Sequence, residues 1–182
     1  MTFQPEKFRE LILYIARKSE DDPKFGAVKL NKILFFSDFA AFRAFGNPIT
    51  GAHYQALAQG PAPRELLRIK NQMESSAEIV EVERSYFGYT QRPIVARREP
   101  RLDRFSAAEI ALVDDVLKRL QPLDGRDVSL LSHEFCGWEA AHANEDIPYE
   151  TALLTFERPT RRDLEMATHL NKVHGWTTAS GM

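Results

Sequence analysis

The chain has 182 residues, of which 43% are hydrophobic and 27% are charged, and its formal net charge is −2. This length and composition predict an ordinary globular protein with one good-sized core, and they give no general reason to expect a membrane or nucleic-acid partner. The charge is uneven, because residues 1–105 hold 17 Lys and Arg against 13 Asp and Glu, whereas residues 106–182 hold 7 against 13. The single cysteine excludes an intramolecular disulfide and fits a reducing cytoplasm, so we expect a cytoplasmic protein.

The first half of the chain predicts three helices and one short strand. Apolar residues at helical spacing follow Pro5 and predict a first helix that ends in the polar segment 19–23. A second, longer helix is expected from about Val28 to Phe45, and a weak alternation over 53–59 indicates a strand. Pro61 is expected at the start of the third helix, because proline is tolerated in the first turn of a helix.

The second half predicts two strands and three helices. The runs 78–84 and 89–97 indicate strands joined by a turn at Gly88. Ser106 with Glu109 three residues later predicts a capping box at the start of a fourth helix. Three further expectations are a fifth helix capped by Asp127 with a kink at Gly137, an amphipathic helix over 160–174 and a frayed tail. The fold class is α+β: a mainly helical single domain around a small antiparallel sheet or β-hairpin, spanning 1–176, followed by a flexible tail at 177–182.

Aromatic residues supply the first candidates for partner contact. The phenylalanines of the second helix do not share one face, which is typical of a helix buried at the centre of its domain. The alternative is that part of this aromatic surface, formed by Phe35, Phe39 or Phe42, meets a partner chain. The predicted tip of the hairpin adds three more aromatic candidates, although these rings could equally fold back onto the sheet: Tyr86, Phe87 and Tyr89.

Motifs of enzymatic chemistry do not emerge from the sequence. His133 and Glu134 begin like the metalloprotease motif HExxH, but Gly137 occupies the position of the second histidine. The stretch GPAP at 60–63 resembles a phosphate-binding turn, but Pro61 and the second proline lack the backbone N–H groups that bind an anion. It is expected instead to be a stiff corner between a strand and the third helix. We therefore expect no enzyme, no metal and no cofactor.

Four segments in order resemble the SocA-like Panacea antitoxin domain. They are KLNKILFFSDF at 29–39, NPITGAHYQALAQGPAP at 47–63, LSHEFCGWEAA at 131–141 and IPYE at 147–150, and the resemblance covers roughly residues 8–154. The family carries a G-P-x-x-P turn, whereas here the second proline follows one position earlier. The positions that match the family's motifs are Lys29, Leu30, Lys32, Gly60, Pro61, His133 and Trp138.

The resemblance implies an antitoxin of a bacterium or phage that neutralises a cognate protein toxin by direct binding. Relatives are paired with unrelated toxins, and at least one also delivers its toxin to a protease, so a protease is a second expected partner. The residues leave one alternative open, a winged-helix-like DNA-binding regulator built from helices and a β-hairpin. The net charge stands against it, because the third helix offers only Arg64, Arg68 and Lys70, so we do not expect a nucleic-acid partner.

Overall fold

The computed structural model describes residues 1–86, 89–154 and 168. Five helices follow the chain as α1 Pro5–Lys18, α2 Ala27–Phe45, α3 Leu66–Ser75, α4 Ala107–Leu120 and α5 Gly125–His133. Shorter turns of helix are η1 Leu102–Arg104, α6 Cys136–Ala140 and η2 Tyr149–Leu153. The strands are β1 Tyr54–Leu57, β2 Gly60–Pro63, β3 Ile79–Glu81, β4 Arg84–Tyr86, β5 Tyr89–Gln91 and β6 Ile94–Ala96. The α+β, mainly helical single domain that the sequence predicts is confirmed.

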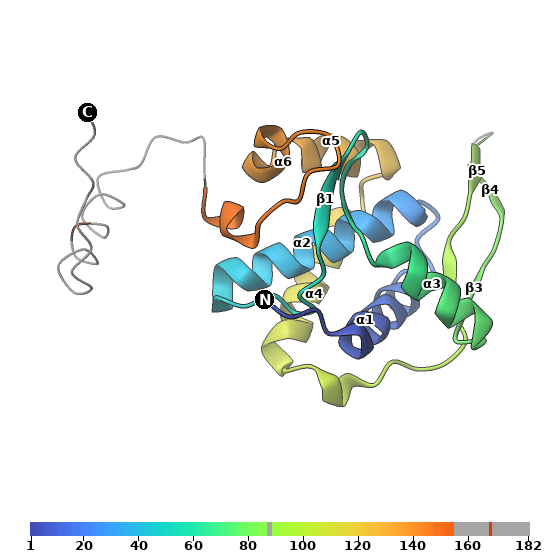
Figure 1. Cartoon of the computed structure of the whole chain (residues 1–182). Helices are drawn as coiled ribbons and strands as arrows, with labels where there is room; N and C mark the ends of the chain where they lie inside the picture. Colours follow the sequence, from blue (N-terminus) through green and yellow to red (C-terminus); the bar gives the residue numbers. More distant parts are fainter. Residues whose placement is uncertain (87–88, 155–167, 169–182) are drawn as a thin grey trace.

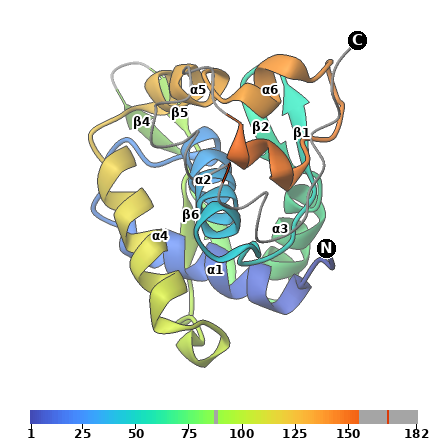
Figure 2. The same ribbon diagram turned by 90° about the vertical axis from the view of Figure 1, so that its left-hand side faces the viewer.

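Helix α2 lies at the centre of the molecule. It contacts α1, α4, α5, β2 and η2, and both views in Figures 1 and 2 place it between α1 on one side and the pair α5–α6 on the other. The helix ends at Gly46, whose N–H donates to the carbonyl of Phe42 and whose left-handed backbone (φ +74°) turns the chain out of the helix. Because its apolar residues point in several directions, α2 is covered nearly all round, as a central helix should be.

The two flanking helices also follow the sequence pattern. In α1 the apolar positions at helical spacing are all fully buried: Phe8, Leu11, Ile12 and Ile15. In α4 the predicted capping box is confirmed, because the Ser106 side chain accepts from the Glu109 N–H and the Glu109 carboxylate accepts from the Ser106 N–H.

The stretch GPAP forms strand β2, so the prediction that it opens the third helix is wrong. β1 and β2 pair antiparallel with Ala56 opposite Pro61. The bond from the Arg64 N–H to the His53 carbonyl (2.8 Å) sets the phase of this ladder. Because hydrogen-bonded and non-hydrogen-bonded pairs alternate, both prolines fall at positions where an N–H would point away from β1. Proline is tolerated there, and α3 begins only at Leu66.

The predicted hairpin of 78–84 and 89–97 is confirmed as two short ladders in one register. β3 pairs with β6 and β4 with β5, and the Val82 N–H donates to the Pro93 carbonyl between them (3.1 Å). Pro93 lies where the ladders separate, because it has no N–H to continue the pairing. The turn predicted at Gly88 lies outside the described residues, as does the helix predicted over 160–174.

A buried carboxylate fixes the base of this hairpin to α1. Glu10 is fully buried, and it accepts two hydrogen bonds from the Arg98 guanidinium and two from Arg101. Burial by itself would raise the pKa of Glu10, but the bonds from Arg98 and Arg101 outweigh it and lower the pKa to about 2. The ion pair therefore joins segments that lie about ninety residues apart in the chain.

The fifth helix differs from its prediction at both ends. Asp124, not Asp127, is its N-cap, because the Asp124 carboxylate accepts from the N–H groups of Arg126 and Asp127. The helix stops at His133, and α6 starts at Cys136 after a break in helical backbone at Phe135. Gly137 is therefore not a kink. It is buried where an added Cβ would lie 2.2 Å from the Thr151 Oγ1.

Candidate functional site

The β1–β2 hairpin is held from one side by a buried lysine of α2. The Lys32 side chain is 2% exposed, and its Nζ donates to the Pro61 carbonyl at 2.9 Å. An ammonium group has three N–H donors, and this carbonyl is the one hydrogen-bond acceptor that it meets in the described part of the chain. Burial without a carboxylate partner lowers the pKa of Lys32 to about 8.

Helices α5 and α6 hold the same hairpin from the other side. The Ser129 hydroxyl donates to the Gln59 carbonyl (2.7 Å), and the Trp138 indole N–H donates to the Leu57 carbonyl (3.1 Å). Gly60 lies at the contact between the two sides with a φ of +91°. A Cβ at that position would lie 2.2 Å from the Ser132 Oγ and 2.8 Å from the Lys32 Nζ. Only glycine therefore fits here without displacing its neighbours. We call this arrangement the hairpin clamp.

His133 closes the clamp at the end of α5. Its ring stacks on Trp138 with the ring centres 3.8 Å apart and an angle of 10° between the planes. Its Nε2 is buried and has no hydrogen-bond partner in the described structure. Burial lowers the pKa of His133, and the nearby Lys32 charge lowers it further. The imidazole is therefore neutral near neutral pH and serves as a packed aromatic ring.

A second buried polar group, Asp38, joins three of the four sequence motifs. Its fully buried carboxylate accepts from the Thr50 N–H at 2.7 Å, from the Thr50 hydroxyl and from the Tyr54 hydroxyl at 2.9 Å. The Tyr149 hydroxyl is 3.5 Å away, and it donates its proton to the Ala52 carbonyl at 2.6 Å. Burial raises the pKa of Asp38 to about 6, although the bonds from Thr50 and Tyr54 counteract part of this rise. Segment 49–54 and η2 are thus both attached to α2 around one carboxylate.

Lys29 lies one turn before Lys32 but outside the hairpin clamp. Its side chain is 1% exposed, and its Nζ contacts the Asp22 carboxylate at 2.6 Å and the carbonyls of Gln121 and Leu123 at 3.0 and 2.8 Å. It therefore ties the start of α2 to the loop before it and to the end of α4. Leu30 lies between the two lysines in sequence and belongs to the hydrophobic core.

The structure places the aromatic candidates of α2 in the core. Phe35, Phe39 and Phe42 are 0%, 3% and 8% exposed, and their rings pack against Tyr54, Phe135 and Tyr149. This supports the interpretation of α2 as a central helix. A partner could contact these three rings only if the core opened.

The aromatic candidates of the hairpin are placed only in part. The backbones of Tyr86 and Tyr89 are paired in the register of β4 and β5. Phe87 lies outside the described residues. These three residues remain predicted partner contacts.

Five of the seven motif residues that the sequence singled out meet in the hairpin clamp, although nothing in the sequence explains their proximity. Lys32, Gly60 and Pro61 meet in the hairpin clamp, as do His133 and Trp138. Sequence reasoning missed Asp38 and Ser132. The available signal for Asp38 was a single carboxylate in a helix that is otherwise apolar on nearly every side, since such a group needs buried donors.

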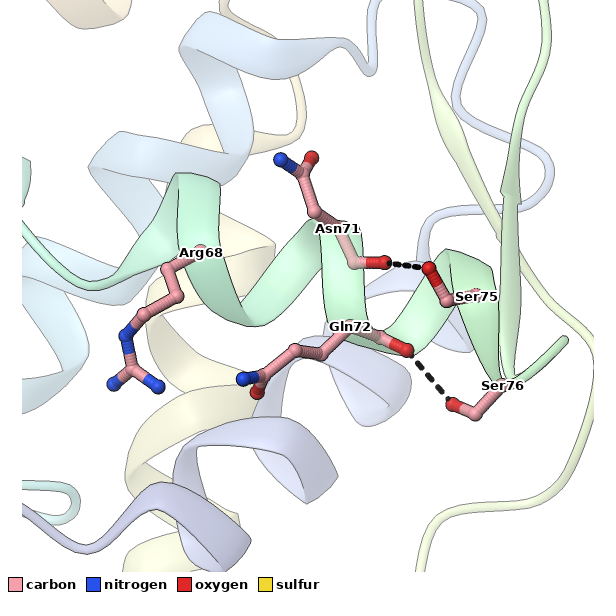
Figure 3. A pocket seen from close by; sticks show the side chains of 5 residues that line it. All are labelled: Arg68, Asn71, Gln72, Ser75 and Ser76. Atoms are coloured by element: carbon pink, nitrogen blue, oxygen red, sulfur yellow. Dashed lines mark hydrogen bonds between the residues drawn. The ribbon is translucent and has the colours of Figure 1, made fainter.

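Features of an enzyme are scarce in the described residues. They contain no group of three or more His, Cys, Asp and Glu side chains that could hold a metal ion. Figure 3 shows a surface hollow on the outward side of α3, where the hydroxyls of Ser75 and Ser76 bond back to the carbonyls of Asn71 and Gln72 in the same helix. Within the described part of the chain, no helix is both long enough and apolar enough to cross a membrane.

The fold and the hairpin clamp define a small α+β domain that is held together by buried polar contacts between its sequence motifs. The family model described as "Antitoxin SocA-like, Panacea domain" matches residues 30–139. The chain belongs to this family. The match includes the hairpin clamp and Asp38, whereas Lys29 and the IPYE segment lie just outside it. A search of curated proteins gave no match.

Proposed function

We propose that this protein is an antitoxin that neutralises a cognate protein toxin by binding it directly. The observation that carries the proposal is the family match over residues 30–139, which includes the hairpin clamp and the central helix. The physical structure supports a binding role, because buried hydrogen bonds to Lys32, Asp38 and Glu10 fix the relative positions of distant segments. A surface that is already ordered before binding loses less conformational entropy when its partner arrives.

Co-expression with the product of the adjacent gene tests this function. The two genes are placed under separate inducible promoters, and growth is measured with the neighbour alone and with both. We expect the neighbour to arrest growth and this chain to restore it, with the two proteins co-purifying in a fixed ratio. Growth arrest that persists while this chain is expressed and folded would contradict the proposal.

The same strains separate simple binding from delivery to a protease. A toxin that is only masked keeps its half-life when the antitoxin is present, whereas a toxin that is delivered to a protease disappears faster. We propose masking as the principal mechanism, because neutralisation by occupancy needs only the ordered surface described above. A pulse-chase measurement of the toxin with and without this chain distinguishes the two, and a shortened half-life would assign the adaptor role.

A DNA-binding role has one structural feature in its favour, since α3 is followed by a long hairpin. Three of the six basic side chains there form ion pairs within the described structure, however, while Arg68, Arg84 and Arg97 have no side-chain partner in it. Lys70 pairs with Glu81, Arg92 with Glu83, and Arg98 with Glu78 and Glu10. Cations that are paired in this way contribute less to phosphate binding and to its salt dependence. A gel-shift titration at low salt with the promoter DNA of the protein's own gene tests this second role.

A further inference from the structure

Helix α5 presents an outward stripe of two leucines between two carboxylates. Leu130 and Leu131 are 53% and 39% exposed, whereas nine of the sixteen leucines in the described residues are buried or packed against the core. Asp127 and Glu134 flank them, so the four residues occupy positions i, i+3, i+4 and i+7 and share one side of the helix. The opposite side is used for folding, because Val128 and Ser132 are fully buried there. We call the four outward residues the α5 stripe.

The segment of the chain that contains the α5 stripe is strongly acidic. Residues 121–154 contain one Arg and seven Asp or Glu, a net charge of −6. Four of these carboxylates are exposed and have no hydrogen-bond or ion-pair partner among the described residues: Asp127, Glu134, Glu139 and Glu150. Carboxylates elsewhere in the fold are commonly paired, as Glu10, Glu78 and Asp22 are. Among the described residues, unpaired carboxylates are therefore more frequent in this segment than in the rest of the chain.

The position of α5 makes the stripe accessible. Figures 1 and 2 both show α5 and α6 together at one end of the domain, with α2 beneath them. Scattered single leucines are common on protein surfaces, but this adjacent exposed pair lies between two unpaired carboxylates and forms a small amphipathic surface that the described residues leave uncovered. Complementary charge around an apolar contact determines which partner binds and how fast it arrives.

We propose that the α5 stripe is the docking site for the toxin, and that the toxin meets it with a surface rich in Lys and Arg around an apolar recess. This rests on the proposed antitoxin function and names the surface that performs it. The leucines supply the apolar contact, and the unpaired carboxylates attract the cationic partner and orient it. A partner with an acidic surface is repelled by the same charges.

Two variants test the two components of this site. Leu130→Ala with Leu131→Ala removes the apolar contact, and Asp127→Asn with Glu134→Gln removes two charges with little change in shape. The control pair is Leu102→Ala with Asp103→Asn in η1, which also has an exposed leucine beside an unpaired carboxylate but lies at the far end of the domain in both views. Circular dichroism and thermal melting establish that each variant is folded.

Binding is measured with the purified product of the adjacent gene, by kinetics at 50 and 500 mM NaCl. For the leucine variant we expect the Kd to rise at least tenfold and growth rescue to be lost. For the charge variant we expect association at 50 mM NaCl to slow several-fold and to depend less on salt than in the wild type. The η1 control should bind and rescue as the wild type does.

The failures of the two proposals are distinguishable. If the wild type binds the toxin and restores growth but both α5 variants behave identically to it, the docking site is overturned and the antitoxin function stands. Equal loss of binding in the η1 control would also overturn the assignment to α5. If the wild type itself neither binds nor rescues, the antitoxin function fails and the docking site fails with it.

Discussion

Two fully buried lysines, one helical turn apart on α2, have opposite surroundings. Lys29 contacts a carboxylate and two carbonyls, whereas Lys32 meets a single carbonyl in the described structure. The cost of burying an ammonium depends on whether its lost hydration is replaced by protein acceptors. Lys29 is therefore a strong tie between three segments, and Lys32 is a charge held at a cost inside the hairpin clamp.

Replacing the two lysines one at a time should produce the largest difference in the free energy of unfolding. Lys29→Met leaves the Asp22 carboxylate and two carbonyls without their shared donor, so we expect a loss of about 3–5 kcal/mol in the free energy of unfolding. Lys32→Met leaves one carbonyl unpaired but also removes a poorly compensated charge, so it should stay within about 1 kcal/mol of the wild type. Urea denaturation at pH 7 measures both. Equal losses would show that the two lysines play the same role.

Glu10, like Lys29, should contribute to the free energy of unfolding, because its buried charge is also well paired. Its pKa is lowered from 4.5 to about 2 in the folded protein, so the unfolded state binds the proton first as pH falls. The stabilisation is fully present above pH 4.5 and is lost between pH 4.5 and 2, by about 3 kcal/mol. Urea denaturation over this range should show a steeper loss in the wild type than in Glu10→Gln.

The exposed ion-paired residue Glu20 provides the matched control for this experiment. Glu20→Gln should keep the acid dependence of the wild type, because a surface ion pair contributes little to stability. An unchanged acid profile in Glu10→Gln would contradict the importance of the buried network.

Lys32 should give the reverse dependence, at the alkaline end. Its pKa is about 8 in the folded protein and about 10.4 when unfolded, so above pH 8 only the unfolded state keeps the proton. Burial of the charged form destabilises the folded state at full strength below pH 8. This destabilisation disappears as the pH rises from 8 to about 10.4. The free energy of unfolding of the wild type, relative to Lys32→Met, should therefore rise by up to about 3 kcal/mol. A difference that stays flat or falls over this range would show that Lys32 is well compensated.

Gly60 tests how tightly the hairpin clamp surrounds Lys32. A Cβ at this position would collide with the Ser132 Oγ and the Lys32 Nζ, and φ is +91°. Gly46 has a similarly positive φ of +74° but no atom within 4 Å of the added Cβ, so it isolates the backbone effect. We expect Gly60→Ala to cost about 2 kcal/mol more than Gly46→Ala in thermal or chemical unfolding. Equal costs would show that the clamp yields easily around an extra methyl group.

The sequence predicted features that depend on neighbours in the chain. The extents of α1 and α2, the capping box at Ser106 and the hairpin over 78–97 all come from periodicity or from residues three or four positions apart. The family resemblance also came from short ordered segments, and the family match confirms it. The α5 stripe was within reach of the sequence, since its spacing is helical, but its exposure was not.

The tertiary structure alone decided which polar residues were buried together. GPAP has a plausible helix start in Pro61, yet pairing with β1 made it a strand, because the prolines fall where the ladder needs no N–H. Asp124, and not Asp127, caps α5, because the Asp124 carboxylate accepts from the N–H groups of Arg126 and Asp127.

Local sequence therefore determined the helices, the hairpin and the family, whereas long-range packing decided what the motifs do. The carbonyl of Pro61 lies 29 residues from Lys32, and the Tyr149 hydroxyl lies 97 residues from its acceptor at Ala52. Such contacts depend on how whole elements pack, so no local pattern specifies them. The physical reason is that a buried polar group needs a hydrogen-bond partner, and packing of distant elements supplies it. The sequence shows that such a group is present but not which residue becomes its partner.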